Sequence, residues 1–438
     1  MNKKINVGIL GLGTVGTAVA KILQDPKGRN PLISNICLSR AAVRNPNRIR
    51  DIDIPDQLIT NNAYEVVDDP NIQVIVEVMG GLEPAKSLIM RAIKSGKSVV
   101  TANKALIARY GKEISEAAKS SGVYVLIEAA VGGGIPIIEP LKQSLGSNKI
   151  NKISCVINGT TNYILTRMEK EGIAYEKVLK DAQELGYAEA DPAADVEGLD
   201  AADKIAILSG LAFGGSINRE NIPTKGINKI ESRDVEYASE LGYKVKLLAV
   251  AEKFKKLKRE ESSIPLSIWV QPTLVPLEHP LASIDGVNNA ILIEGDPIGE
   301  VMFYGPGAGG GATASAVVAD ILNIAGISMV KGSNSSLDPL LAGNSWRNCH
   351  LIKGSDVFQK HYLRLKAKDE PGVIGKIGSA FGTHGVSIQS IVQLEANETD
   401  AEIVVITHEV VQEKIDYSLS TIQSMSEIRG ISAQMVCI

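Results

Sequence analysis

The chain has few of the side chains that build metal centres or disulfide frameworks. It contains four cysteines and five histidines in 438 residues, and the cysteines are far apart with no paired spacing. A structural zinc site needs clustered Cys and His ligands, and a disulfide scaffold needs many cysteines in a short chain. The sequence therefore argues against both and predicts reduced, structural thiols at Cys37, Cys155, Cys349 and Cys437.

The sequence also lacks an excess of positive charge and a long apolar run. Its net charge of -4 provides no general attraction for nucleic acid or an anionic membrane. We find no apolar run of the roughly 20 residues that a membrane helix needs, and MNKKINVGIL leads into a fold motif instead of a cleavable signal. We therefore expect a cytoplasmic protein with no nucleic-acid or membrane partner.

Aromatic residues are scarce as well, at 4% of the chain. The core must then consist mainly of Ile, Val, Leu and Ala, which is typical of α/β proteins. A chain of 438 residues is too long for one ordinary domain, so we expect two or three.

The N-terminus carries a dinucleotide-binding pattern. Residues 4–10 predict a short buried strand, GLGTVG follows, and TAVAKILQ continues as a helix. In such a turn one glycine permits the bend, a second lets a pyrophosphate approach the backbone, and a third lets the helix pack on the strand. The alternative is a glycine-rich turn without a ligand. The cofactor residues predicted in the turn are Gly11, Gly13, Thr14, Val15 and Gly16.

The residues after the second strand bear on which dinucleotide binds. NAD enzymes often place a carboxylate there for the ribose hydroxyl, but CLSRAAV is followed by Arg44, with Arg48 and Arg50 nearby. Guanidinium groups suit a 2′-phosphate. We therefore predict NADP, with NAD as the alternative cofactor, and a solvated basic loop as the alternative interpretation.

Further strands and helices alternate up to Ala130. VIVEVMGG, SVVTANK and VYVLIEAA are buried-strand patterns separated by helical segments, which predicts a doubly wound parallel sheet over residues 1–130. Ligands bind beyond the carboxyl ends of such strands. Thr101 and Lys104 should therefore line the cleft, although an exposed lysine is the alternative for Lys104.

Beyond Ala130 the pattern changes to that of an antiparallel α+β domain, over residues 131–304. The second glycine-rich turn, GPGAGGG, opens a helix and provides Gly307 and Gly309 as further cofactor candidates. Residues 305–342 would then fold back onto the N-terminal domain. A hinge between domains is the alternative.

One acidic stretch, ELGYAEADPAADVEGLDAADKIAIL, contains a single lysine. Asp200 and Lys204 are four residues apart and share a helix face. Glu189 and Asp195 precede them in an irregular, proline-containing segment. A lysine among carboxylates would bind an ammonium-bearing substrate and keep a proton donor beside it. An exposed acidic loop is the alternative.

The motifs GLGTVG, TANKAL, EAAVGGGIP, INGTTNYIL, the acidic stretch and GPGAGGGATASAVVAD together resemble homoserine dehydrogenase over roughly residues 1–345. The resemblance implies NAD(P)H-dependent, reversible reduction of L-aspartate 4-semialdehyde to L-homoserine, in threonine, methionine and isoleucine synthesis. It implies that Lys204 transfers the proton, that Lys104 assists near the nicotinamide, and that Glu189, Asp195 and Asp200 hold the substrate's amino group and orient the lysine.

The same resemblance implies a monovalent cation, usually sodium, in the EAAVGGGIP turn. Its ligands would be the carboxylate of Glu128 and the backbone carbonyls of Val131, Gly133 and Ile135.

The tail, residues 357–438, predicts a small βαββαβ unit, and DEPGVIGKI within it resembles an ACT domain, which implies a ferredoxin-like fold. Residues 343–356 would be a linker. The resemblance implies an amino-acid effector, with threonine as the candidate, and pairing into a homodimer or homotetramer. A dimerisation module that binds nothing is the alternative.

Two other functions fit parts of the chain. A semialdehyde dehydrogenase needs a catalytic cysteine motif, which is absent around Cys155. A non-catalytic nucleotide-binding regulator with a sensing ACT domain fits both ends of the chain but leaves the acidic lysine stretch unexplained.

Overall fold

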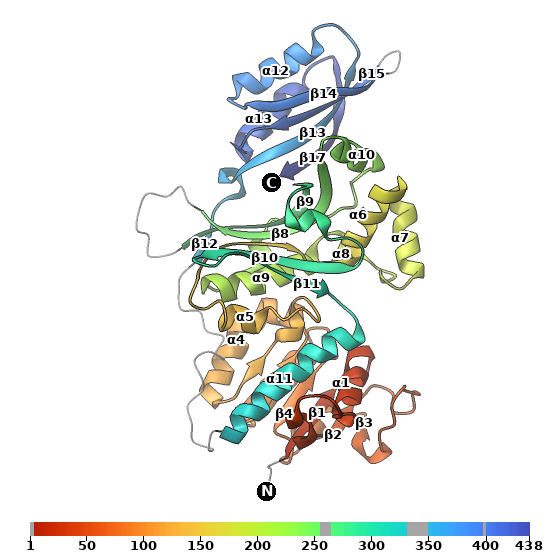
Figure 1. The fold of residues 1–438 in the computed structure, drawn as a ribbon, viewed down its shortest axis with the longest axis vertical. Helices are drawn as coiled ribbons and strands as arrows, with labels where there is room; N and C mark the ends of the chain where they lie inside the picture. Colours follow the sequence, from red (N-terminus) through yellow and green to blue (C-terminus); the bar gives the residue numbers. More distant parts are fainter. Residues whose placement is uncertain (1–3, 255–263, 331–348, 397–399) are drawn as a thin grey trace.

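The N-terminal part is a parallel sheet in the doubly wound order. The computed structural model describes residues 4–254, 264–330, 349–396 and 400–438 (Figure 1). Within them the first sheet has the order β3-β2-β1-β4-β5-β6. Its chain order reverses between β1 and β4, which creates the crevice where such folds bind ligands. The strands are β1 (Ile5–Leu10), β2 (Ile36–Ala42), β3 (Ile59–Thr60), β4 (Val74–Glu77), β5 (Ser98–Thr101) and β6 (Val125–Leu126).

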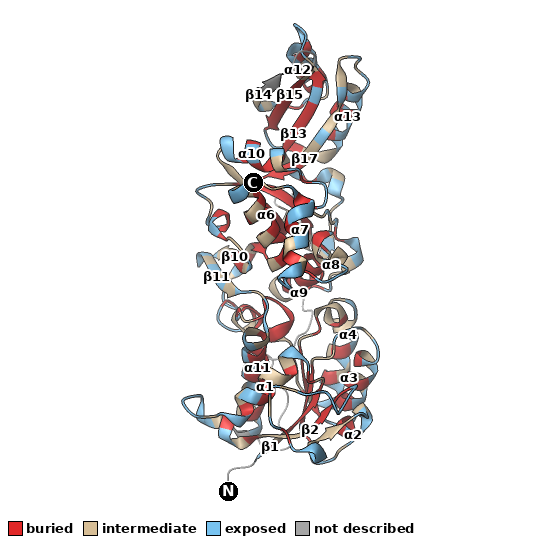
Figure 2. Cartoon of the chain, turned by 90° about the vertical axis from the view of Figure 1, so that its right-hand side faces the viewer, coloured by how far each residue is buried: buried red, intermediate tan, exposed pale blue. Residues whose placement is uncertain are grey.

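Helices cover both faces of this sheet, so its central strands are buried (Figure 2). That double burial explains why β1, β4 and β5 are nearly continuous runs of Val and Ile. The helices are α1 (Thr14–Gln24), α2 (Ala63–Val67), α3 (Ala85–Lys94) and α4 (Lys104–Ser121), and α11 (Gly310–Val330) returns to this part late in the chain.

Helix α11 corrects one expectation from the sequence. Its residues 310–328 are long and apolar enough to cross a membrane by length and composition, whereas no such segment was expected. The helix packs against α1, and its buried residues share a core with Val7, Ile9 and Val19. This placement is that of a core helix, because its apolar surface is covered by protein.

The central part is an antiparallel sheet in the order β11-β10-β7-β8-β9. Helices pack on one face of it, and residues 281–284 cover apolar residues on the other. The strands are β7 (Lys149–Val156), β8 (Tyr243–Lys253), β9 (Ile264–Pro276), β10 (Asn288–Asp296) and β11 (Gly299–Pro306). The helices are α5 (Ile138–Lys142), α6 (Gly159–Glu171), α7 (Tyr175–Glu184), α8 (Ala193–Val196), α9 (Leu199–Phe213) and α10 (Ser232–Glu240).

The C-terminal part has the order strand, helix, two strands, helix, strand, with one short additional strand. Its sheet order is β17-β13-β15-β14, and β16 pairs with β13. The elements are β13 (Phe358–Lys368), α12 (Val373–Thr383), β14 (Ile388–Ala396), β15 (Asp400–Thr407), β16 (Val410–Val411), α13 (Gln412–Gln423) and β17 (Ile428–Cys437).

This C-terminal part continues the central sheet, a feature that the sequence did not predict. Strand β17 pairs in parallel with β9, where Val436 lies opposite Thr273. Of the predicted linker, residues 343–348 lie outside the described residues, and the remainder includes a strand, β12 (Cys349–Leu351), that pairs with β9. The described portion of that segment is therefore partly built into the sheet.

Buried charges join the same two parts. Arg364 of β13 is 1% exposed, and its guanidinium donates to Asp234 of α10 at 2.8 Å. It also donates to Glu231 at 2.7 Å and to Glu402 at 2.9 Å. The carboxylates share the buried positive charge, so loss of one partner would leave an uncompensated charge between the two parts.

His361 of β13 makes the protein sensitive to acid. Its imidazole is 1% exposed and has no hydrogen-bond partner among the described residues, and burial together with the charge of Lys225 lowers its pKa from 6.5 to about 4. The unfolded chain takes up this proton below pH 6.5 and the folded chain only near pH 4. Stability should therefore fall as the pH drops through this window, by about 2 kcal/mol at pH 5.

To test this, the free energy of unfolding of the wild type and of His361→Phe is measured by chemical denaturation at pH 7 and at pH 5. The variant should lose less stability between the two pH values, whereas His408→Phe, at an exposed position, should behave like wild type. Equal acid sensitivity in all three proteins would contradict the assignment.

Candidate active site

Three glycine-containing turns meet at the carboxyl ends of the N-terminal strands. Helix α1 begins after Gly13 with no side-chain cap, so its first amide groups face outward. Gly11 has a φ of 103°, and a Cβ on Gly16 would overlap the carbonyl oxygen of Gly11. Only glycine fits at these two positions; between Gly13 and Gly16, Thr14 is exposed and Val15 is half-buried against the core. The turn provides the backbone cradle that a pyrophosphate needs.

The other two turns stack on the first. A Cβ on Gly133 would overlap the carbonyl group of Gly307, and one on Gly310 would overlap the Thr14 side chain. The amide of Gly134 also donates to the carbonyl of Pro306 at 3.2 Å. The predicted residues Gly307 and Gly309 therefore lie on a turn that precedes α11 and packs against the N-terminus of α1.

The ends of β4 and β5 are locked by a carboxylate that the sequence reasoning missed. Glu77 is fully buried, accepts the hydroxyl of Thr101 at 2.6 Å and accepts the amide of Met79 at 2.8 Å. The Thr101 hydroxyl also accepts the amide of Asn103, at 3.0 Å. Thr101 therefore positions the start of α4, and its hydroxyl proton is already donated to Glu77. The available signal was an acidic residue at the end of an otherwise apolar strand.

The two predicted lysines meet at one carboxylate. Lys104 lies at the first turn of α4, and its Nζ is 2.6 Å from Asp200 Oδ1. Lys204 lies one turn beyond Asp200 on α9, with its Nζ 2.7 Å from Asp200 Oδ2. Lys204 also donates to the carbonyl of Ile157 at 2.8 Å. Asp200 thus holds both ammonium groups at the junction of the N-terminal and central parts.

Burial and charge oppose one another at this cluster, and charge prevails. Burial alone would raise the pKa of Asp200, but Lys204 and Lys104 hold it below its usual value. Burial alone would lower the pKa of Lys104, but Asp200 raises it above the usual value. Asp200 is therefore ionised and Lys104 protonated at neutral pH.

Asn158 connects this cluster to the substrate side of the cleft, and the sequence reasoning missed it. Its side-chain nitrogen donates to Asp195 Oδ1 at 2.7 Å and to Asp200 Oδ2 at 2.9 Å. Its oxygen caps α6 by accepting the amide of Thr161 at 2.9 Å. The hydroxyl of Thr160 adds a 3.2 Å contact to Asp195. The signal was an Asn at a strand-to-helix junction, an N-cap position, within a motif already singled out.

Glu189 is not drawn into this network. It is exposed on the loop after α7, and its backbone carbonyl accepts from Gln183 at 3.1 Å. Among the described residues its carboxylate makes no ion pair with Lys104 or Lys204. The structure therefore joins Asp195 and Asp200 through Asn158 and leaves Glu189 outside.

The basic loop after β2 divides into two roles. Arg44 is exposed two residues beyond the end of β2, on the side where the strands finish. Arg50 instead donates to the carbonyls of Asn45, Pro46 and Arg48 at 2.8 to 3.2 Å. Arg50 thereby closes the loop, and Arg44 has its guanidinium exposed.

Around Glu128 lies a group of three carboxylates. Glu128 is 4% exposed and accepts the amides of residues 137, 138 and 139 at 2.6 to 2.8 Å. Asp320 of α11 is fully buried; it accepts the Glu128 amide at 2.9 Å through one oxygen, while the other has no partner among the described residues. One oxygen each from Glu128, Glu139 and Asp320 lies within 4.8 Å of the others. Burial raises the pKa of Glu128 and of Asp320.

Family models match most of the chain. The model described as homoserine dehydrogenase, NAD binding domain, covers residues 11–128, and that of homoserine dehydrogenase covers residues 136–322. The ACT domain model covers residues 361–416. The predicted fold class is confirmed: a Rossmann-type sheet, a central α+β part and a C-terminal ACT domain.

Relatives align along nearly the whole chain. A homoserine dehydrogenase from Synechocystis sp. is 51% identical over 427 residues, 98% of each protein. The crystal structure of a homoserine dehydrogenase from Thiobacillus denitrificans has a TM-score of 0.90 at 39% identity, covering 100% of this chain and 98% of that one. A hyperthermophilic archaeal homoserine dehydrogenase in complex with NADPH has a TM-score of 0.61 at 30% identity, covering 73% of this chain and 97% of that one.

The glycine cradle, the lysine–carboxylate cluster and these matches define an oxidoreductase that uses a nicotinamide dinucleotide. Nothing in the comparisons favours a non-catalytic regulator. Within that class the chain belongs to the homoserine dehydrogenase family.

Proposed function

We propose that the chain interconverts L-aspartate 4-semialdehyde and L-homoserine, with Lys204 as the proton-transferring group. The observation that carries the proposal is the shared carboxylate of Asp200, which holds Lys204 and Lys104 at 2.7 and 2.6 Å beside the dinucleotide cradle. When bound, the nicotinamide exchanges a hydride with the carbon that bears the reacting oxygen. The chain's own task is the proton.

Reduction of the aldehyde requires a proton donor at its oxygen, because negative charge grows there as the hydride arrives. Lys204 has three N–H bonds, of which one is directed to Asp200 and one to the carbonyl of Ile157. The third remains for the substrate oxygen. Lys104 stays protonated beside it and adds positive charge, and in homoserine oxidation Lys204 takes the proton back.

The substrate's ammonium would be held by carboxylates on the other side of Asn158. Asp195 is half-buried, and its two oxygens accept from Asn158 and Thr160. A carboxylate accepts about four hydrogen bonds, so Asp195 keeps capacity for an ammonium group. Glu189 would join it only if the loop after α7 moves inward when substrate binds.

Substrate discrimination tests this assignment. With L-homoserine the purified protein should reduce the cofactor. 4-Hydroxybutanoate lacks the ammonium group and leaves the Asp195 carboxylate without its partner, so its kcat/KM should be at least roughly 100-fold lower. Equal reaction with both compounds would argue that the carboxylates do not recognise an amino acid.

Cofactor choice is proposed to favour NADP through Arg44, which is exposed just beyond the end of β2, where dinucleotide-binding folds contact the ribose. Arg44→Ser should lower kcat/KM for NADP by roughly 10-fold or more, the usual effect of one charge-assisted hydrogen bond, and should leave NAD unchanged. Steady-state rates with both cofactors are the check, and Lys94→Ser, at an exposed position on α3, is the control. An equal loss with both cofactors would refute the phosphate contact.

A monovalent cation is proposed at the Glu128 turn, with the carbonyls of Val131, Gly133 and Ile135. The donors are all hard oxygen atoms, and buried Asp320 nearby has one oxygen without a hydrogen-bond partner among the described residues, which supports a cation in this place. The three backbone amides on Glu128 compete with such an ion, which suggests loose binding. Rates in sodium, potassium and tetramethylammonium at equal ionic strength should differ, and Glu128→Gln should abolish the difference. Indifference of the wild type to the cation would contradict the site.

The ACT domain is proposed to bind threonine. Homoserine is an intermediate in the synthesis of threonine, methionine and isoleucine, so threonine is an end product of the pathway. Its sheet is continuous with the catalytic sheet through β17 and β9, which supports transmission of a signal. We further propose a cytoplasmic homodimer or homotetramer.

The division of labour proposed is that residues 1–130 with 305–342 bind the nucleotide, residues 131–304 bind substrate and subunit partner, and residues 357–438 regulate.

A further inference from the structure

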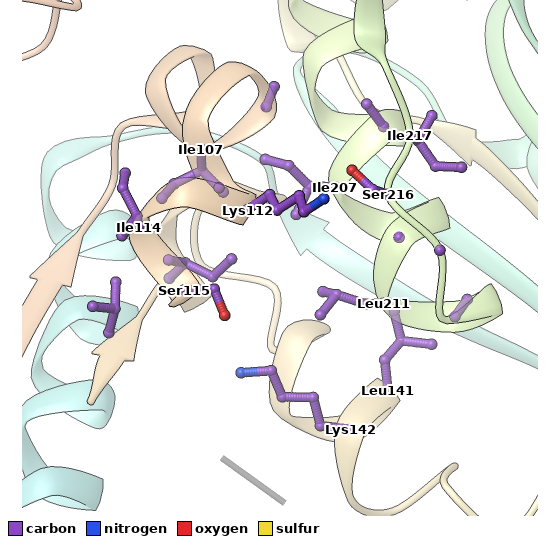
Figure 3. Close-up of a pocket in the computed structure, with 18 of the residues that line it drawn as sticks. Ile107, Lys112, Ile114, Ser115, Leu141, Lys142, Ile207, Leu211, Ser216 and Ile217 are labelled. Atoms are coloured by element: carbon purple, nitrogen blue, oxygen red, sulfur yellow. The ribbon is translucent and has the colours of Figure 1, made fainter. Parts of the chain in front are cut away.

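A cavity of about 960 Å³ lies between α4 and α9, away from the reacting groups. It is bounded by residues 107–119 of α4, by α5 and the residues after it, by 206–212 of α9 and by 215–220 (Figure 3). Neither the lysine–carboxylate cluster nor any of the three glycine turns contributes to its lining. The cavity is therefore separate from the proposed reaction site.

The cavity has an apolar floor and a basic rim. Branched side chains form the floor, and the rim carries five cationic side chains against one carboxylate, that of Glu220. Apolar residues of the floor include Ile107, Ile114, Leu141, Ile207 and Leu211, and the cations are Arg109, Lys112, Lys119, Lys142 and Arg219.

The five cations differ in how firmly they are already paired. Arg109 and Arg219 share one buried carboxylate, Asp203, at 3.4 and 2.9 Å. Lys112 is 4.0 Å from Glu116, and Lys142 is 3.4 Å from Glu139. These ion pairs are longer than the 2.6 Å pair of the reaction site. Figure 3 shows the Lys112 ammonium group directed toward Ile207 and Ser216, and that of Lys142 directed toward the side of Ser115. Lys112 and Lys142 therefore keep N–H donors for a further anion.

We propose that this cavity binds a small organic acid, with its apolar body on the floor and its anionic group beside Lys142, the more buried of the two lysines, while the exposed Lys112 adds positive charge. The volume matches that of ligand pockets, about 300–1,000 Å³, and the surplus of positive charge selects an anion over a neutral compound. The side chain of Lys142 is only 9% exposed, so an anion beside it would be largely shielded from water and strongly attracted.

Occupancy of the cavity affects turnover through the two helices that form it. Lys104 lies at the start of α4, and Asp200 and Lys204 lie at the start of α9. The cavity separates later residues of the same helices. A ligand wedged there changes the angle between them and hence the contact between Lys104 and Asp200, which lowers kcat. This consequence rests on the proposed function, whereas the binding itself does not.

The binding test uses the full chain and 8-anilinonaphthalene-1-sulfonate, an apolar anion that fluoresces when it leaves water. Its neutral analogue N-phenyl-1-naphthylamine tests the need for charge, and saturating NADP keeps either dye out of the cofactor cleft. We expect one dye per chain, an affinity for the sulfonate at least roughly 10-fold above that for the analogue, and lower kcat for homoserine oxidation in its presence.

Two kinds of variant locate the dye. Leu211→Trp should weaken binding by placing a larger side chain over the apolar floor, and Lys112→Met with Lys142→Met should weaken it by roughly 10-fold or more. The control is Lys94→Met with Lys180→Met, which removes two exposed lysines elsewhere and should bind like wild type.

Several outcomes would overturn the proposal. Absence of binding, displacement by NADP, or unchanged binding in both cavity variants would refute the site. Equal affinity for the two dyes would refute the anion preference. Binding of the expected kind with unchanged kcat would refute the coupling to turnover. Because binding is read by fluorescence, a chain that proved inactive toward homoserine would still show whether the cavity binds the dye.

Discussion

Lys204→Met should lower kcat for homoserine oxidation by roughly 10² to 10⁴-fold, the usual contribution of a positioned proton-transfer group. Methionine is close to lysine in shape, so the packing around α9 should persist. The ion pair with Asp200 at 2.7 Å and the hydrogen bond to the carbonyl of Ile157 at 2.8 Å are lost. Affinity for the dinucleotide should change little, because the glycine cradle does not involve this side chain. Steady-state rates and cofactor titration measure the two quantities.

A matched control for this variant is Lys246→Met. Lys246 is as deeply buried, at 1% exposure, but its ammonium group lies 3.2 Å from Asn162 and from Asp285, outside the cluster. Its loss should reduce stability and leave kcat within a few-fold of wild type. If Lys204→Met kept most of its activity, or if both variants lost activity equally, Lys204 would not be the proton-transferring group.

Asp200→Asn should have the second-largest effect. It should lower the stability of the protein and change the pH dependence of kcat. The amide cannot neutralise two ammonium groups, and loss of one partner of a buried pair costs about 3–5 kcal/mol. Asp200 now raises the pKa of Lys104, so its removal should lower that pKa. Any decline in kcat on the alkaline side that reflects loss of the Lys104 proton should then begin at a lower pH than in wild type.

The stability consequence follows from the same pKa changes. The Asp200 carboxylate contributes stability that is present above the unfolded value near 3.9 and is lost as the pH falls below it. Lys104 contributes stability that is present below its unfolded value near 10.4 and is lost above it. Urea denaturation between these limits should therefore show a nearly constant deficit for Asp200→Asn.

Asp203→Asn is the control. Asp203 is on the same helix, similarly buried at 6%, and is also held between two cations, Arg109 and Arg219. Its substitution should cost stability but move the alkaline limb much less than Asp200→Asn does, because Asp203 contributes less than Asp200 to the raised pKa of Lys104. A pH–rate profile unchanged by Asp200→Asn would show that the carboxylate does not set the charge state of Lys104.

Features that depend on local sequence could be predicted. Two glycines specify the conformation of the dinucleotide turn: Gly11 has a positive φ, and the position of Gly16 admits no Cβ. Gly13 has open space around it, which leaves its backbone accessible to a pyrophosphate. The strand before the turn is apolar because both faces are buried. The pairing of Asp200 with Lys204 was readable because an i,i+4 spacing on one helix fixes it. The contact of Lys104 with Asp200 was not predicted, since the two residues lie on different helices; the resemblance implied only that Lys104 lies near the nicotinamide and substrate.

Features that depend on packing between distant parts of the chain could not be predicted from the sequence. Asn158 acts through Asp195 and Asp200, 37 and 42 residues away, and Asp320 reaches Glu128 across 192 residues. The pairing of β17 with β9 likewise could not be predicted, because the hydrophobic pattern of a strand does not show which distant strand it pairs with. For Glu189 the resemblance predicted a place among the carboxylates of the site, but the structure has it exposed on a loop, because a motif position does not fix the conformation of an exposed loop.

The most direct test is the initial rate of cofactor reduction when purified protein is given L-homoserine, with NADP and NAD compared side by side and with L-threonine present or absent. We predict turnover with both substrates saturating, a higher kcat/KM with NADP, and a lower rate with threonine. Absence of turnover with either cofactor would contradict the assignment of Lys204, Lys104 and Asp200 to this reaction.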